Sequence, residues 1–216
     1  MKDFSGGNDE KLVRYLSGVY APEDAVLREA RERSLKAGLP EIQVGPMDAL
    51  HLEVIARAAG ARKAVEIGTL GGYSGIVLAR ALGEGGLLHT FELEARHAEV
   101  ARESFRRAGV LDRVRIHVGS ALERLPDCEG DGPFDLVFID ADKESYPAYL
   151  DWAARHLRVG GTVLGDNAFA FGELADGRGA GPVAMRRFNE ELAKGGRFRA
   201  TVLPTGEGLA MAVKVR

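Results

Sequence analysis

The stretch FDLVFIDADKESYPAYLDWAARHLRVGGTVLGDN, residues 134–167, contains two apolar runs with a helical segment between them. The runs FDLVFID and GTVLGD have the length and aliphatic content of buried strands, and residues 146–157 have the pattern of a helix. A strand, helix, strand unit of this kind joins two parallel strands of one sheet. The stretch therefore predicts an α/β fold.

The same alternation is repeated on both sides of this stretch. Upstream strands are predicted at KAVEIG (63–68), GLLHTFEL (86–93) and VRIHVG (114–119), with helices at 73–82 and 94–108 and a short helical turn after the third strand. Downstream, a helix is predicted at 182–193. The last two apolar runs, RFRATVLP and GLAMAVKV, are joined by a short turn around TGEG, so one of these strands must be antiparallel to its neighbour.

The first sixty residues show the pattern of about three helices and no strand. Pro22 suits the first turn of one helix, which Gly38 and Pro40 would end. The next helix, within 45–60, has Leu50, Val54 and Ile55 on one face. We expect these helices to cover the active edge of the sheet or to pack in a dimer.

The length and composition are those of one soluble globular domain. The chain has 216 residues, 45% of them hydrophobic and 28% charged, and its net charge of −3 argues against a protein built around nucleic acid. We expect one domain over 1–216, with a helical cap at 1–60 and an α/β core at 61–216. Cys128 is the single cysteine, which excludes an internal disulfide and a cysteine zinc cluster. The N-terminus has no signal-peptide pattern, so a cytoplasmic protein is expected.

Oxygen-bearing side chains follow the two strands of the opening stretch. Asp140 ends the first, and Asp166 with Asn167 ends the second. Carboxylate and amide oxygens at one sheet edge are typical ligands of a divalent cation such as Mg²⁺, and Lys143 adds a candidate base beside them. The alternative is that Asp140 caps a turn or helix and that Asp166 and Asn167 form a loop turn. Because both strand ends carry such residues, the cation site is favoured.

The first strand leads into a glycine-rich turn, VEIGTLGGYSG (65–75). It lacks the dinucleotide fingerprint G-x-G-x-x-G because position 70 is leucine. Glu66 is suited to a cationic amino acid group, and Ser74 opens the next helix, whose start accepts polar atoms. The second strand ends at Glu92, placed to bind a ribose, and Gly119-Ser120-Ala121 is small enough to flank a flat base. These three strand ends together suggest a nucleoside with a charged tail.

With these motifs in order, the chain resembles the S-adenosylmethionine-dependent O-methyltransferases of the catechol and caffeoyl-CoA type, including their small bacterial cation-dependent members. The resemblance extends over nearly the whole chain, through VEIGTLGGYS, FELEARHAEVAR, FDLVFIDADKESY, GGTVLGDN, RRFNEEL and LPTGEGLAMAVK. It implies a Rossmann-like class I methyltransferase fold with a seven-stranded, mostly parallel sheet, an antiparallel C-terminal hairpin strand and additional N-terminal helices.

The resemblance also implies roles for individual residues. Asp140, Asp166 and Asn167 would bind the cation, Mg²⁺ before Mn²⁺ or Ca²⁺. Lys143 would be the general base, and Asp140 and Asn167 would share in catalysis. The residues implied for S-adenosylmethionine are Val44, Glu66, Gly68, Thr69, Gly72, Tyr73, Ser74, Glu92, Ser120, Ala121, Asp140 and Asp142. A homodimer is also implied.

Three functions remain open at this level. The first is a metal-dependent O-methyltransferase acting on a small aromatic with vicinal hydroxyls. The second is a tRNA enzyme that methylates a hydroxylated uridine, which the net acidity disfavours. The third is a non-catalytic cofactor-binding or scaffold protein, which Asp140, Lys143, Asp166 and Asn167 together disfavour. Residues 168–182 have the composition of a mobile lid that would select the substrate. None of the five histidines shows ligand spacing, and they are interpreted as surface or packing residues.

Overall fold

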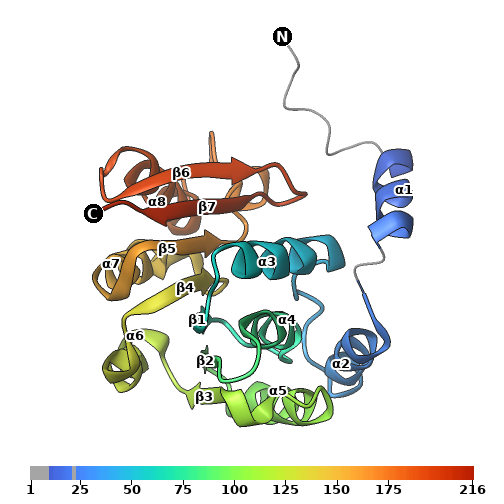
Figure 1. Cartoon of the computed structure of the whole chain (residues 1–216). Coiled ribbons are helices and arrows are strands. Elements are labelled where there is room, and N and C mark those ends of the chain that lie inside the picture. The colour runs from blue at the N-terminus through green and yellow to red at the C-terminus, as the bar shows by residue number, and fades with distance from the viewer. Residues whose placement is uncertain (1–9, 21–22) are drawn as a thin grey trace.

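A seven-stranded sheet runs through the middle of the molecule, in the order β3-β2-β1-β4-β5-β7-β6 (Figure 1). The computed structural model describes residues 10–20 and 23–216. The strands are β1 (Lys63–Ile67), β2 (Leu87–Glu92), β3 (Val114–Val118), β4 (Phe134–Ile139), β5 (Leu157–Gly165), β6 (Phe198–Leu203) and β7 (Leu209–Lys214).

The strand directions confirm the predicted Rossmann-like sheet. β1 pairs in parallel with β2 and β4, and β2 with β3 and β4 with β5 are also parallel. β7 is antiparallel to both β5 and β6, as the short final turn requires. Strand order reverses between β1 and β4, and in open α/β sheets ligands bind at the carboxyl ends of the strands beside such a reversal.

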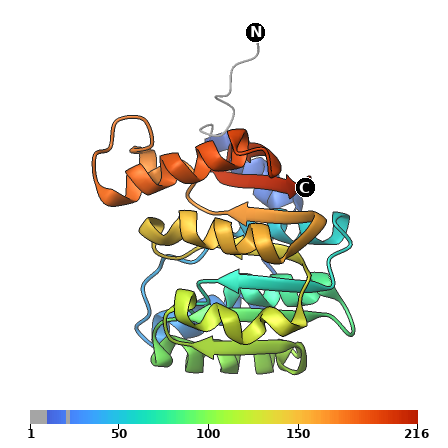
Figure 2. The ribbon, with the colours of Figure 1, turned by 90° about the vertical axis from the view of Figure 1, so that its left-hand side faces the viewer.

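Helices cover both faces of the sheet, as the alternating pattern predicts. α3, α4 and α5 lie on one face, while α6, α7 and α8 lie side by side across the other, coloured yellow-green to red in Figure 2. The helices are α1 (Glu10–Tyr20), α2 (Ala25–Lys36), α3 (Pro46–Ala58), α4 (Tyr73–Leu82), α5 (Ala95–Arg107), α6 (Ala121–Arg124), α7 (Tyr146–His156) and α8 (Ala180–Lys194). No helix in residues 10–20 and 23–216 has the length and apolar character needed to cross a membrane.

The helix predicted around Pro22 begins later than expected. Pro22 lies outside the described residues, and α2 starts at Ala25 because the Asp24 carboxylate accepts a hydrogen bond from the backbone N–H of Leu27 at 2.9 Å. Its end agrees with the prediction, since Gly38 follows the helix at φ +73°.

The buried face of α3 differs from the predicted one. α3 packs against the molecule through Ala49, Leu52 and Ala56. Of the predicted face, Ile55 packs against the core, while Val54 is 57% exposed and Leu50 is half-buried. Small alanines let α3 approach α4 closely. This close packing, and not the positions of the larger apolar residues, determines which face of α3 is buried.

Each face of the sheet has its own hydrophobic core. The first core joins Leu27 of α2 and Leu52 of α3 to Ile76 of α4 and Phe105 of α5. The second lies under α7 and α8 and includes the fully buried Tyr146 and Phe188. Because residues of α2 and α3 belong to the first core, these two helices pack as part of the α/β unit.

Candidate active site

A cavity of about 960 Å³ lies at the carboxyl ends of the parallel strands. Its walls come from the segments that follow β1 to β5 and from residues 40–45, which precede α3. Of the predicted site residues, those that line it are Val44, Gly68, Thr69, Tyr73, Ser74, Glu92, Ser120, Ala121, Asp140, Asp142, Lys143, Asp166 and Asn167. The fold therefore brings most of the predicted set to one place.

Gly68 brings two strand ends into direct contact. Its φ is +102°, and a Cβ atom there would lie 1.9 Å from the carbonyl oxygen of Asp140. Only glycine allows this approach, because a side chain would overlap the neighbouring backbone. The turn after β1 is thereby held against the first residue beyond β4.

Glu92 is held at the end of β2 by backbone donors. Its carboxylate accepts hydrogen bonds from the N–H of Leu70 at 2.7 Å and of Glu94 at 3.0 Å, and His97 lies 3.3 Å away. The side chain is largely buried, so its remaining acceptor positions face the cavity. This placement fits a carboxylate that receives hydroxyl donors from a ribose.

Glu66 lies beneath the cavity rather than in its wall. The side chain is fully buried, and its Oε2 accepts a hydrogen bond from the Thr90 hydroxyl at 2.6 Å. The Thr90 oxygen lies 2.5 Å from the Thr69 hydroxyl, and Thr69 lines the cavity. Burial raises the pKa of Glu66 to about 7, and its other oxygen, Oε1, has no hydrogen-bond partner. This unpaired oxygen could accept a hydrogen bond from a cationic ligand group.

Gly72 also lies outside the cavity lining. It precedes α4 at φ +87°, and a Cβ there would lie 3.1 Å from the Phe105 ring. Gly72 therefore serves the close packing of α4 on α5, which is a structural role.

Two carboxylates meet where β4 and β5 end. Burial raises the pKa of Asp140, and burial together with the charge of Asp140 raises the pKa of Asp166 to about 7. Asn167 beside them adopts φ +54°, a conformation that asparagine tolerates better than most residues. Two crowded carboxylates and an amide fit a hard divalent cation, whose charge would relieve their repulsion. In the described part of the chain, no group of three or more His, Cys, Asp or Glu side chains is placed to hold a metal, so a cation here would also need the amide oxygen of Asn167.

Lys143 lies beside these carboxylates in a short 3₁₀ turn, η4 (Lys143–Ser145). Its Nζ is 3.4 Å from Asp140 Oδ1 and donates to the Tyr146 hydroxyl at 2.7 Å. Asp142 begins the same turn, and its carboxylate accepts hydrogen bonds from the Ser145 N–H at 3.1 Å and the Tyr149 hydroxyl at 2.8 Å. The turn thus places one acidic side chain, Asp142, and one basic side chain, Lys143, in the lining of the cavity.

Several lining residues were not predicted individually from the sequence. Asp48 of α3, Phe171 and Glu207 line the cavity near the acidic strand ends, and His97 and Tyr149 also contribute. Phe171 belongs to the predicted lid segment, so composition indicated its region but not the residue. Asp48 and Glu207 carry no sequence signal, because they reach the cavity only through the packing of α3 and the β6–β7 turn.

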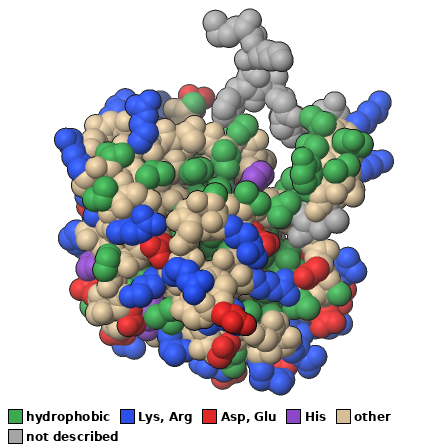
Figure 3. All heavy atoms as spheres, in the orientation of Figure 1, with side chains coloured by type: hydrophobic (Ala, Val, Ile, Leu, Met, Phe, Trp, Pro, Cys, Tyr) green, Lys and Arg blue, Asp and Glu red, His purple; other side chains and the backbone are tan. Residues whose placement is uncertain are grey.

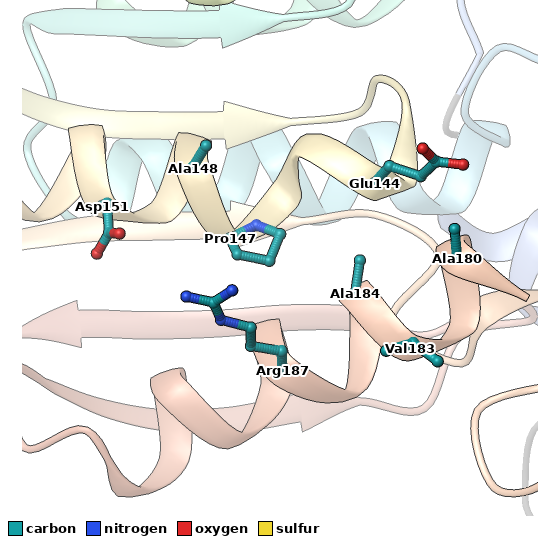
Figure 4. Close-up of a pocket in the computed structure, with 8 residues that line it drawn as sticks. All are labelled: Glu144, Pro147, Ala148, Asp151, Ala180, Val183, Ala184 and Arg187. Carbon is teal, nitrogen blue, oxygen red and sulfur yellow. The ribbon is translucent and has the colours of Figure 1, made fainter. Parts of the chain in front are cut away.

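A second, smaller groove lies between α7 and α8 (Figure 4). It has a volume of about 450 Å³ and is lined largely by small apolar side chains, including Pro147, Ala148 and Ala184. Glu144, Asp151 and Arg187 are its charged members. None of the predicted cofactor or metal residues lies there, so the larger cavity is the candidate active site.

Known proteins with similar sequences and structures are methyltransferases. A family model described as O-methyltransferase matches residues 17–215. A catechol O-methyltransferase of Mycobacterium tuberculosis is 42% identical over 95% of this chain and 96% of its own length. One of Niastella koreensis is 38% identical over 94% of this chain and 96% of its own.

A solved structure gives the same result at the level of the fold. The O-methyltransferase of Bacillus cereus in complex with SAH has a TM-score of 0.88 and 40% identity, with 93% of this chain and 96% of that chain covered. This likeness, together with the strand order, confirms the predicted class I methyltransferase fold.

Proposed function

The chain belongs to the O-methyltransferase family, and from this membership we propose that it methylates one hydroxyl of a small catechol-like aromatic. The methyl donor is S-adenosylmethionine, which supplies an electrophilic methyl group on a sulfonium. The observation that carries the proposal is one cavity lined both by the ends of β1 to β3, where Glu92 lies, and by the acidic ends of β4 and β5. Support for the donor comes from the Bacillus cereus relative, which was solved with SAH.

The donor half of the cavity is formed by the ends of β1, β2 and β3. Glu92 would accept the ribose hydroxyls, while Ser120 and Ala121 would flank the adenine. Val44, Thr69 and Ser74 lie where the methionine portion would bind. Glu66 would accept a hydrogen bond from the amino group of the methionine portion through its unpaired Oε1.

The acceptor half is formed by the ends of β4 and β5. Asp140, Asp166 and Asn167 would hold a divalent cation, Mg²⁺ being the best match to these oxygens. When bound, such an ion lowers the pKa of two adjacent hydroxyl oxygens that chelate it. An acceptor with vicinal hydroxyls is therefore favoured over one with a single hydroxyl.

Lys143 would remove the proton from the attacking hydroxyl. A phenol has a pKa of about 10, so it is a weak nucleophile at neutral pH until its proton is taken. In the neutral amine form, Lys143 accepts that proton on Nζ, and the oxygen keeps the electron pair that attacks the methyl carbon. Asp140, 3.4 Å from Nζ, then faces the ammonium that forms.

The tRNA alternative has less support. The two relatives described above are named catechol O-methyltransferases, and the chain has a net charge of −3. Acidic residues also surround the acceptor half, including Asp48 and Glu207, where a phosphate backbone would be repelled. A small aromatic acceptor fits these charges better. The single cysteine further favours a cytoplasmic enzyme.

The test is a methyl-transfer screen with labelled S-adenosylmethionine. Catechols, their single-hydroxyl analogues and hydroxylated tRNA are each assayed with and without a chelator, followed by addition of Mg²⁺. We expect methylation of the catechols alone, its loss on chelation, and its recovery with Mg²⁺. Full activity after exhaustive metal removal would contradict the metal-assisted mechanism, and methylation of tRNA alone would replace the proposed substrate class.

A further inference from the structure

The Tyr146 hydroxyl lies at the meeting point of the general-base candidate and both acidic strand ends. Tyr146 is fully buried at the start of α7, and its ring packs edge-on against Phe188 with centroids 5.1 Å apart. Its oxygen is 2.7 Å from Lys143 Nζ, 3.0 Å from the carbonyl oxygen of Ile139 and 3.1 Å from that of Asp166. Three separate segments therefore converge on one hydroxyl.

The chemistry of these partners fixes the direction of each hydrogen bond. A tyrosine hydroxyl has one hydrogen to donate, and a backbone carbonyl can only accept. The hydroxyl hydrogen therefore points to the Ile139 or the Asp166 carbonyl, both of which are within hydrogen-bond distance. Toward Lys143, Tyr146 presents only lone pairs, so it is an obligate acceptor for the lysine.

From this geometry we propose that Tyr146 is the positioning residue that aims the lone pair of Lys143 into the cavity, an inference that rests on the proposed role of Lys143 as base. A neutral amine has two N–H groups and one lone pair. One N–H is used by Tyr146 at 2.7 Å, and the second faces Asp140 Oδ1 at 3.4 Å. The lone pair takes the remaining direction, and Lys143 lines the cavity.

The proton transfer leaves this arrangement in place. The acceptor O–H bond breaks with its electron pair remaining on oxygen, and a new N–H bond forms from the Lys143 lone pair. The resulting ammonium keeps its two earlier hydrogen bonds, so no side chain has to rotate. Because the same hydroxyl lies within hydrogen-bond distance of the Ile139 and Asp166 carbonyls and donates to one of them, Lys143 is held beside the strand ends that carry the proposed ligands.

A purely structural role is the competing explanation, since the hydroxyl also satisfies buried carbonyls. Two substitutions separate the possibilities. Tyr146→Phe keeps the ring and removes the hydroxyl. Tyr146→4-aminophenylalanine restores N–H donors for both carbonyls, but its nitrogen lone pair is delocalised into the ring and accepts poorly. A structural role predicts recovery with the amino variant, whereas the positioning role predicts none.

The experiment measures kcat, KM and S-adenosylmethionine binding for each variant in the wild-type and Lys143→Ala backgrounds. For Tyr146→Phe we expect kcat to fall roughly 10- to 100-fold, because a misplaced general base loses part of its usual contribution to the rate. Cofactor affinity should be unchanged. The amino variant should be equally slow. In the Lys143→Ala background, Tyr146→Phe should cause no further loss, because the residue through which it acts is gone. Melting temperature and cofactor binding verify that each variant is folded.

Tyr149→Phe is the matched contrast, because it removes a hydroxyl from the same helix that bonds Asp142 instead. Its effect should fall on the KM for S-adenosylmethionine and should persist in the Lys143→Ala background. An unchanged kcat in Tyr146→Phe, recovery with the amino variant, or the same loss in both backgrounds would overturn the positioning role. Full activity of Lys143→Ala alone would instead overturn the base assignment itself, so the two failures are distinguishable.

Discussion

Burial raises the pKa of three carboxylates at the cavity, those of Glu66, Asp140 and Asp166, and these are held in two ways. Asp140 and Asp166 lie together at two strand ends and suit a shared cation, whereas Glu66 lies below and accepts a hydrogen bond from the Thr90 hydroxyl. Burial without a full set of partners disfavours the charged form of a carboxylate. Each of these carboxylates therefore holds a proton more readily than an exposed one does.

Glu66 gives a prediction about stability and pH. Its pKa is about 7 in the folded protein and near 4.5 when exposed, so the folded state binds the extra proton between these values. Stability contributed by protonated Glu66 is thus present below pH 4.5 and is lost as the pH rises through 7. Glu66→Gln cannot ionise, so at pH 8 the ligand-free variant should be more stable than the wild type by up to about 3 kcal/mol.

The measurement is urea unfolding of both proteins at pH 5 and pH 8. Other titrating groups are common to both chains, so their contributions cancel in the difference between them. Near pH 5 the two free energies of unfolding should be similar. A constant difference across the whole range would show that Glu66 is ionised in the folded state.

Asp166 gives a prediction about the cation. Asp166→Asn removes one negative charge from the proposed ligand set. We expect Mn²⁺ affinity to fall at least about 10-fold, the size of effect that substitutions at metal sites usually have on metal affinity. Electron paramagnetic resonance of free Mn²⁺ measures this without any reaction. Asp151→Asn is the control, since Asp151 pairs with Arg197 at 2.8 Å and lies away from the cavity. Equal Mn²⁺ affinity in the two variants would place the cation elsewhere.

At the scale of elements, most strands and helices could be predicted from the sequence. Apolar runs of five or six residues between glycine-rich turns are sufficient to identify strands such as β1 and β4, and the predicted bounds of α4 are those observed. Of the predicted face of α3, Ile55 packs against the core but Val54 is exposed, because the closeness of α3 to α4 depends on alanines. The role of Tyr146 could not be predicted either, since the two carbonyls it bonds lie 7 and 20 residues away in the chain and meet only in the folded sheet.

Gly68 supports a prediction about the joint between β1 and β4. In Gly68→Ala the new Cβ would overlap the Asp140 carbonyl at 1.9 Å and the backbone would be strained at φ +102°. We expect a loss of about 4 kcal/mol or more, the range typical of severe overlap. Gly60→Ala is the control, because φ is +61° there and nothing lies within 4 Å of the added Cβ. Thermal unfolding compares them, and equal losses would show that the contact is not tight.

At the scale of the whole molecule, α1 stands apart from the sheet and exposes an apolar surface. Tyr15, Val19 and Tyr20 are each more than half exposed, and Figure 3 shows apolar side chains gathered over this helix. Val54 on the outer face of α3 is also exposed. Exposed apolar groups on an element of this kind favour association, which supports the expected homodimer.

Light scattering tests this association. The wild-type chain should have twice the mass of one chain, and Tyr15→Ser combined with Val19→Ser should produce monomers. Val159→Ser is the control, since Val159 is 63% exposed but lies at the start of β5, away from the carboxyl strand ends. A wild-type monomer would contradict the prediction, as would a dimer that survives the double substitution.

The contact at Gly68 has a further consequence for how this enzyme family can diversify. Because the backbones of the β1 turn and Asp140 touch, the floor of the cavity is stiff, and the ends of β1 and β4 keep a fixed separation. Residues 40–45 and Phe171 form side walls, where Ile42 and Phe171 are more than half exposed, so substitutions there disturb little packing. Changes in these walls can therefore alter which molecule enters while the ends of β1 and β4 keep their separation.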